Sequence, residues 1–216
     1  MRLLRLFLAL IFAFSLVFSM AHAKQPKKAG AKSTKAAIAK SKPAAKGNAT
    51  YKLKSAKARV RSFFNAAYYE LREMGYSTSQ ALNAAFVVSI HCWRESNMYG
   101  AGVAKWLYEN HHAINPAHIT VPTEWKGIWK REWDNGVSVR KKWAGWATYE
   151  DAARGTIEYI QRNNSRAFKA ALRGDINGYA DAVSNSNYHN GNAQDYRKVL
   201  VDCAPTVKRM LEKAKE

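Results

Sequence analysis

Residues 77–96 read STSQALNAAFVVSIHCWRES, an apolar run that begins with a capping pattern and ends in a carboxylic acid. The Ser-x-x-Gln spacing at its start is that of a capping box, so we expect a helix to begin here. Val88, Cys92 and Glu95 follow i, i+4, i+7 spacing and share one face of that helix. A carboxyl on such an apolar face loses hydration, which raises its pKa toward the range of a general acid. We interpret Glu95 as a candidate catalytic acid; a solvent-exposed Glu at a helix end is the alternative.

The chain after about residue 51 is predicted to be mainly helical. Further helical patterns lie at 59–74, 149–162, 167–172, 175–183 and 193–215. Gly75 ends the first of these patterns, and Pro205 interrupts the last because a proline removes a backbone donor. Residues 51–216 are long enough to form one domain with its own core.

Tryptophans dominate the stretch 120–146, where they lie among basic and β-branched residues. The turn Asp134-Asn135-Gly136 separates two such runs, which predicts a β-hairpin. Alternation along the first strand gives one face with Ile128, Lys130, Glu132 and Asp134 and another with Trp129, Arg131 and Trp133. The predicted fold class is therefore α+β and mainly α, a helical body with a small hairpin lobe and a cleft between them. Glu132 could face Glu95 across that cleft.

The N-terminus has the pattern of a secretory signal peptide. A basic start is followed by an apolar stretch at residues 6–18 and by Ala21-His22-Ala23, the small-x-small pattern of a cleavage site. We expect residues 1–23 to be removed and the chain from Lys24 to be exported, either to the periplasm or out of the cell. The alternative is an uncleaved membrane anchor, although the apolar stretch is short for a spanning helix.

Residues 24–50 form a Lys- and Ala-rich tail. Between Lys24 and Arg61 there are 13 Lys and Arg residues and no acidic residue, whereas the 20 basic and 16 acidic residues that follow leave a net charge of about +4. Self-repulsion and the scarcity of large apolar residues predict disorder. We expect the tail to bind anionic polymers of the cell envelope; anionic lipids, or no partner at all, are the alternatives. Nucleic acid is not expected, because the chain is exported and the tail lacks aromatics for base stacking.

The two cysteines, Cys92 and Cys203, leave two possibilities open. They could form a disulfide between the Glu95 helix and the last helix, or remain as two buried thiols. His111, His112 and His118 show neither the His-Glu-x-x-His nor the paired-Cys spacing of a zinc site. We expect neither a metal nor another cofactor.

From about residue 81 onward the chain resembles the glucosaminidases of glycoside hydrolase family 73, within the lysozyme superfamily. The shared features are an acid followed by Ser ahead of a Gly, an Asn-led turn, a strand Glu before a Gly, a small-residue helix start, a helical hairpin and an Asp-Tyr pair. In this chain they lie, in the same order, at Glu95-Ser96 and Gly100, 110–114, Glu132 and Gly136, 143–151, 159–179 and Asp195-Tyr196. The chain departs from the family pattern at Lys130, which replaces a Thr, and in the His-rich turn.

The resemblance implies a lysozyme-like fold and an endo-β-N-acetylglucosaminidase that hydrolyses β-1,4 bonds of peptidoglycan strands. It implies that Glu95 is the general acid, that Glu132 is the second carboxylate and that Tyr196 positions the substrate's N-acetyl group. If Glu132 stands too far from Glu95, the N-acetyl group itself could act as the nucleophile. The residues expected to contact sugar are Asn110, Trp129, Trp133 and Tyr188.

Two other functions remain open. Arg94-Glu95-Ser96-Asn97 also resembles the acid motif of muramidases and lytic transglycosylases, and residues 188–191 resemble one of their loops. The Gly-Leu-Met-Gln element of those enzymes is missing. The third function is that of a non-catalytic wall-binding protein, which would keep the fold and use the basic tail for adhesion.

Overall fold

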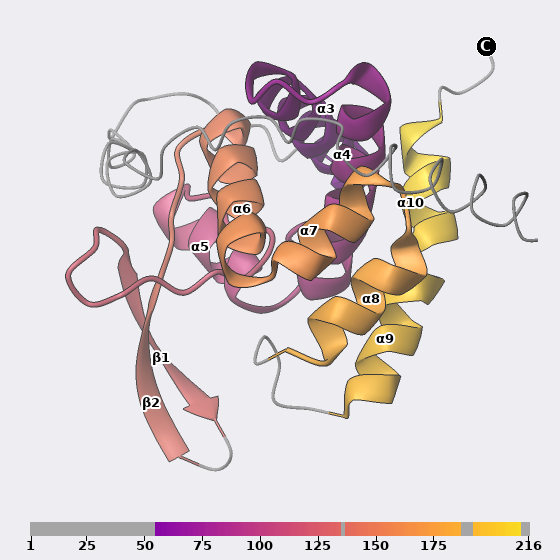
Figure 1. Cartoon of the computed structure of the whole chain (residues 1–216). Helices are drawn as coiled ribbons and strands as arrows, with labels where there is room; N and C mark the ends of the chain where they lie inside the picture. Colours follow the sequence, from indigo (N-terminus) through magenta and orange to yellow (C-terminus); the bar gives the residue numbers. More distant parts are fainter. Residues whose placement is uncertain (1–54, 135–136, 187–191, 213–216) are drawn as a thin grey trace, which may run out of the picture. The chain divides into compact units, whose positions relative to one another are not determined.

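The structure is a computed structural model that describes residues 55–134, 137–186 and 192–212. The predicted signal peptide, the Lys-rich tail and Tyr188 lie outside the described residues, as does the side chain of Trp133. Helices and one β-hairpin make up the described part (Figure 1). In chain order they are α3 (Ala56–Glu73), α4 (Thr78–Ser96), α5 (Gly102–His111), β1 (Ile128–Asp134), β2 (Val137–Trp143), α6 (Tyr149–Asn163), α7 (Ser165–Leu172), α8 (Ile176–Ser184), α9 (Ala193–Asp202) and α10 (Ala204–Leu211).

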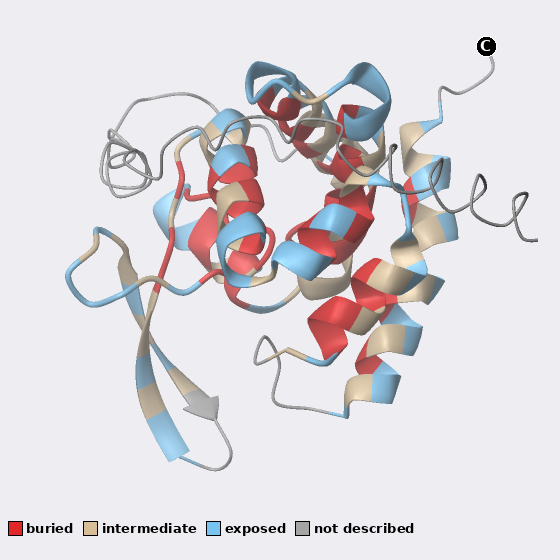
Figure 2. Ribbon diagram, viewed as in Figure 1, coloured by how far each residue is buried: buried red, intermediate tan, exposed pale blue. Residues whose placement is uncertain are grey.

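Helix α4 is the centre of the helical body and packs against α3, α5, α7, α9 and α10. The predicted capping box begins it: the Gln80 N–H donates to Ser77 Oγ at 3.2 Å, and the Ser77 N–H donates to Gln80 Oε1 at 3.1 Å. Ala81, Ala84 and Ala85 are fully buried, and such small side chains let neighbouring helices approach closely. Figure 2 shows the buried faces of the helices turned toward one another. The helix predicted from residues 77–96 is confirmed.

Strands β1 and β2 form a two-stranded antiparallel sheet joined at the predicted turn. Asp134 pairs with Val137 and Ile128 with Trp143, so the connection has two residues and the side chains alternate as predicted. The hairpin extends away from the helices (Figure 1). The predicted fold class, α+β and mainly α with a small hairpin lobe, is confirmed.

The hairpin lobe also includes the segment 114–121, which the sequence pattern does not predict. Ile114 and Trp146 exchange two backbone hydrogen bonds, of 2.8 and 3.1 Å, and the Ala144 N–H donates to the Ile119 carbonyl at 2.9 Å. The pattern does not predict α5 either, because the residue at its start, Ala101, provides no side-chain cap. Both features depend on partners that are distant along the chain.

The last predicted helix is interrupted near Pro205, as expected, and forms two helices. Helix α9 ends at Asp202, and α10 begins at Ala204 with Pro205 in its first turn.

Cys92 is buried on α4 and Cys203 is half-buried between α9 and α10, and both are free thiols, so the disulfide is not formed in this structure. None of the described helices is both long enough and apolar enough to cross a membrane.

Gly155 on α6 is required by the tryptophan that packs against it. A Cβ at this position would lie 2.4 Å from Cζ2 of Trp146, whose side chain is buried. Gly155→Ala gains about 1 kcal/mol in helix propensity, but the overpacking costs about 1–3 kcal/mol. We expect a net loss of unfolding free energy in urea denaturation. Gly100→Ala is the control, since its Cβ would make only ordinary contacts; equal stability of the two variants would contradict this account.

Candidate active site

Glu95 lies in the last turn of α4, where its side chain is 14% exposed. The chain leaves the helix through three consecutive residues in the left-handed region, Asn97 (φ 43°), Met98 (φ 41°) and Tyr99 (φ 76°). This conformation is strained for residues other than Gly. It ends the helix immediately after the acid, so that the carboxyl stands at the edge of the helical body.

The strained exit is held by Arg59 on α3. Its Nε donates to the Met98 carbonyl at 2.6 Å, and its guanidinium lies 5.3 Å from the ring centre of Tyr99. Tyr99 in turn stacks on Tyr108 of α5, with ring centres 5.1 Å apart. These contacts stabilise the segment and so offset part of the cost of its backbone conformation.

Tyr196 reaches Glu95 from α9. Its Oη donates a hydrogen bond of 2.6 Å to Glu95 Oε1. Burial raises the pKa of Tyr196 far above its ordinary value, and the nearby Glu95 charge raises it further, so the phenol stays protonated. Arg94 covers the ring of Tyr196 at 4.9 Å. Tyr196 is thus a permanent hydrogen-bond donor to one oxygen of the candidate acid.

His118 faces the other oxygen of Glu95, with its Nδ1 3.7 Å from Oε2. Its Nε2 accepts the backbone N–H of Ala104 at 3.3 Å, in the first turn of α5. Burial is the main cause that lowers the pKa of His118 to about 4, so the imidazole is neutral at pH 7. Because Nε2 is an acceptor, the single ring proton belongs on Nδ1 and points toward Glu95.

The backbone around His118 is built to place this ring. His118 has a φ of 51°, in the left-handed region that histidine adopts more readily than most residues. Asn115 fixes the turn before it: its buried side chain donates to the carbonyls of Ile119 and Ala144, both at 2.9 Å, and accepts the Ile119 N–H. Gly102 leaves room for the ring, since a Cβ there would lie 2.8 Å from His118 Cε1.

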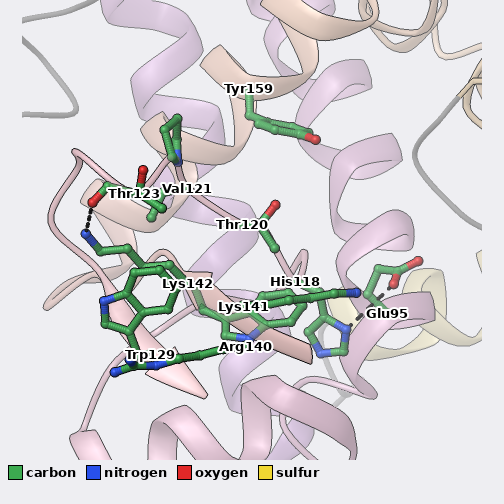
Figure 3. A pocket seen from close by; sticks show the side chains of 12 residues that line it. Glu95, His118, Thr120, Val121, Thr123, Trp129, Arg140, Lys141, Lys142 and Tyr159 are labelled. Atoms are coloured by element: carbon green, nitrogen blue, oxygen red, sulfur yellow. Dashed lines mark hydrogen bonds and ion pairs between the residues drawn. The ribbon is translucent and has the colours of Figure 1, made fainter. Parts of the chain in front are cut away.

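A pocket of about 650 Å³ opens beside Glu95 and His118 and continues along the hairpin. In Figure 3 these two residues lie at one end, Trp129, Arg140 and Lys142 lie at the other, and Lys141 extends between the two ends toward Glu95. Glu95 is the single carboxyl among the described residues that line the pocket. The full lining is Glu95, His118, Thr120, Val121, Pro122, Thr123, Trp129, Arg140, Lys141, Lys142, Trp143 and Tyr159.

Glu132 does not line this pocket. It lies on β1, with its side chain 18% exposed, and its Oε1 accepts Lys130 Nζ at 2.8 Å. Its negative charge raises the pKa of His118, against the larger effect of burial, so it lies within electrostatic reach of that ring. The structure therefore places Glu132 near His118 and outside the residues that line this pocket.

Of the other predicted site residues that the structure describes, one lines the pocket and one does not. Trp129 lines the pocket with 38% of its surface exposed. Asn110 does not: it is exposed near the end of α5, and its amide donates to the Trp106 carbonyl at 2.9 Å. Asn115, five residues later, holds the turn that carries His118, and neither residue was predicted as a site residue. In the sequence, the run Asn-Pro-Ala-His-Ile at 115–119 is the local pattern that could have indicated them.

No group of three or more His, Cys, Asp or Glu residues in the described part is arranged to hold a metal ion. Glu95 stands at the edge of an open pocket. Its Oε1 accepts a hydrogen bond from Tyr196, and the neutral ring of His118 lies 3.7 Å from its Oε2. Such a carboxyl can give a proton to a bound group and then accept hydrogen bonds from Tyr196 and His118 as it becomes charged.

The fold is similar to those of two solved catalytic domains. The catalytic domain of the autolysin Auto from Listeria monocytogenes is similar, with a TM-score of 0.50 and 12% identity over 73% of this chain and 87% of that domain. A C-terminally truncated glycoside hydrolase domain of FlgJ from Salmonella typhimurium has a TM-score of 0.49 and 18% identity over 71% of this chain and 98% of that one. No protein-family model and no curated protein sequence matches the chain. The similarity to the Auto domain agrees with the mainly helical fold and small hairpin lobe, and at this identity it concerns the fold alone.

Two variants of His118 separate its two hydrogen-bonding roles. His118→Gln retains an acceptor near the Nε2 position for the Ala104 N–H, and His118→Asn retains a donor near the Nδ1 position toward Glu95. We expect the Gln variant to lose about tenfold in kcat at nearly unchanged stability, which corresponds to one hydrogen bond. We expect the Asn variant to keep kcat and to lose about 1 kcal/mol of unfolding free energy, the worth of a helix cap. The reverse pattern would exclude the orientation assigned to the ring.

Proposed function

We propose that the protein is an exported glycoside hydrolase that cleaves β-1,4 bonds in the glycan strands of peptidoglycan, with Glu95 as the general acid. The observation that supports this most directly is the Glu95 carboxyl, largely removed from water at the edge of an open pocket. Its Oε1 is held by Tyr196 at 2.6 Å. The fold shared with glycoside hydrolase domains agrees with this function but does not by itself establish it.

Glu95 Oε2 is the oxygen that carries the proton in this mechanism, because Oε1 already accepts the Tyr196 hydroxyl. Transfer of that proton to the glycosidic oxygen leaves a carboxylate. The Nδ1–H of His118, 3.7 Å away, can then approach the new charge. An interaction that strengthens as charge develops lowers the barrier, whereas one that is equally strong before the reaction does not.

The oxocarbenium-like centre needs a second group. Because Glu95 is the single carboxyl among the described lining residues, we favour the substrate's own N-acetyl group as the nucleophile. Glu132 remains the alternative, as a base that activates water, and would have to approach through a movement of the hairpin. Glu132→Gln separates the two, since a loss comparable to that of the acid variant is expected only if Glu132 activates the water.

The shape around the pocket suits a polymer. Tyr159 lines the 650 Å³ pocket and two others, of about 380 and 520 Å³. Three hollows that each include Tyr159 in their lining offer more room than a single sugar ring requires, as an enzyme that cuts within a chain would need.

The bond that is cut identifies the enzyme class within this proposal. We favour the N-acetylglucosaminidase, and mass spectrometry of the products from purified peptidoglycan tests it. Reducing-end N-acetylglucosamine is the expected product. Reducing or anhydro-N-acetylmuramic acid would instead assign the muramidase or lytic transglycosylase activity.

The Lys-rich tail is proposed to hold the enzyme on anionic polymers of the envelope. Deleting residues 24–46 is expected to weaken binding to purified sacculi about tenfold or more at low salt, with the difference disappearing at high salt. Cleavage of short soluble glycans should not change. A tail of the same length with each Lys replaced by Ser distinguishes charge from length, and retention by that neutral tail at low salt would contradict the tether.

A further inference from the structure

The hairpin side of the Glu95 pocket is rich in positive charge. Arg140, Lys141 and Lys142 line it, and Glu95 is the single acidic residue in the part of the lining that the structure describes. His118 is neutral at pH 7 and offsets none of this charge. A concave surface with one dominant sign of charge concentrates ligands of the opposite sign.

Two of these cations are held in place by Trp129. Lys142 is its direct partner across the hairpin, with Nζ 5.5 Å from the ring centre, and the Arg140 guanidinium lies 4.7 Å from it. Lys142 Nζ also donates to the Thr123 carbonyl at 2.7 Å. Side chains that are already ordered lose little entropy when a ligand binds. We call Trp129, Arg140 and Lys142 the basic wall.

The two faces of the hairpin differ in how their charges are compensated. On one face Lys130 pairs with Glu132 at 2.8 Å. On the face that forms the basic wall, neither Arg140 nor Lys142 is ion-paired with a carboxylate among the described residues. Figure 3 shows both beside Trp129 at the end of the pocket away from Glu95.

We propose that the basic wall binds carboxylates carried by the glycan strand, so that the enzyme prefers peptidoglycan to an uncharged polymer of the same linkage. The inference rests on the proposed function, because the wall and Glu95 share one pocket and the group bound there belongs to the molecule being cut. Guanidinium and ammonium groups are the usual partners of carboxylates. Two sources supply such groups: the peptide stems, and the lactyl carboxylate that is freed when the stems are removed.

Binding to a Glu95→Gln form of the full chain tests this without consuming the substrate. Three soluble ligands of equal length are compared: stem-bearing strands, strands stripped of stems by an amidase, and chito-oligosaccharide. The test variant adds Arg140→Gln and Lys142→Gln. The control adds Arg166→Gln and Lys169→Gln on the exposed face of α7, which removes the same charge and leaves the tail unchanged.

The ratio of Kd for chito-oligosaccharide to Kd for stem-bearing strands is expected to fall about tenfold in the test variant and to stay constant in the control. A fall confined to stem-bearing strands assigns the carboxylates of the stems, and an equal fall with stripped strands shows that the wall also accepts the freed lactyl carboxylate. An unchanged ratio, or the same fall in the control, overturns the inference.

Wild-type cleavage, followed in parallel, keeps the two proposals apart. If the wild type cleaves strands while the ratio stays unchanged in the test variant, this inference alone fails. If the ratio falls as expected while the wild type releases no sugar, carboxylate binding stands and the hydrolase function fails.

Discussion

Replacing Glu95 with Gln is expected to lower kcat on peptidoglycan by about 10²- to 10⁴-fold, the usual contribution of a general acid. The amide retains the shape of the side chain and an oxygen that can accept the Tyr196 hydroxyl, which lies 2.6 Å from Oε1 in the wild type. It cannot supply a proton to the leaving oxygen. The loss should therefore appear in kcat, with little change in substrate affinity or in the free energy of unfolding.

Zymography on purified peptidoglycan, with the chain from Lys24 onward, shows whether the activity is lost in Glu95→Gln. Initial rates on soluble strands then measure how far kcat falls. Glu150→Gln is the matched control, because Glu150 is exposed in the first turn of α6 and does not line the pocket. If Glu95→Gln clears the wall as fast as the wild type, Glu95 is not the acid. If neither protein clears it although both are folded and bind sacculi, the chain is a wall-binding protein.

Acid is expected to destabilise this protein strongly between about pH 6.5 and pH 4. His91 is buried on α4 with Nδ1 2.9 Å from Tyr179 Oη, and burial is the main cause that lowers its pKa to about 3. The pKa of His118 falls to about 4 for the same reason. Below pH 6.5 the unfolded chain therefore binds protons that the folded chain does not, and unfolding free energy falls with pH.

Below pH 6.5 the slope from each histidine approaches about 1.4 kcal/mol per pH unit, so that at pH 5 the two together have removed about 4 kcal/mol relative to neutral pH. This stability is fully present above pH 6.5. It is lost as the pH falls toward each folded-state pKa, below which no further loss occurs. Such a change is a large part of the stability of an ordinary domain.

Urea denaturation at pH 7, 6 and 5 measures the slope directly. His91→Gln keeps a polar side chain beside Tyr179 but cannot be protonated, so we expect the slope to fall by about half. His111→Gln, at the exposed end of α5, should keep the slope of the wild type. A slope that is equally steep in all three proteins would exclude His91 as a source of the acid sensitivity.

Local signals were sufficient for most of the elements. The capping box before α4 acts over three residues, and Asp134-Asn135-Gly136 determines the hairpin by the geometry of a two-residue connection. Helix α5 has no such local signal, since the acceptor for its Ala104 N–H is His118, 14 residues further on. Local sequence does not distinguish Asn110 from Asn115: the side chain of Asn110 bonds within α5, whereas that of Asn115 donates to the Ala144 carbonyl, a contact that depends on the tertiary structure.

The mainly helical fold, the hairpin and the position of Glu95 at the end of an apolar helix all follow from local sequence patterns. These properties depend on periodicity and capping, which act within a few residues. The tertiary structure decided which groups surround that acid. Tyr196 reaches it across 101 positions, His118 meets its other oxygen, and Glu132 lies outside its pocket. The packing of every element determines such encounters, and with them the loss of water that makes a carboxyl useful as an acid.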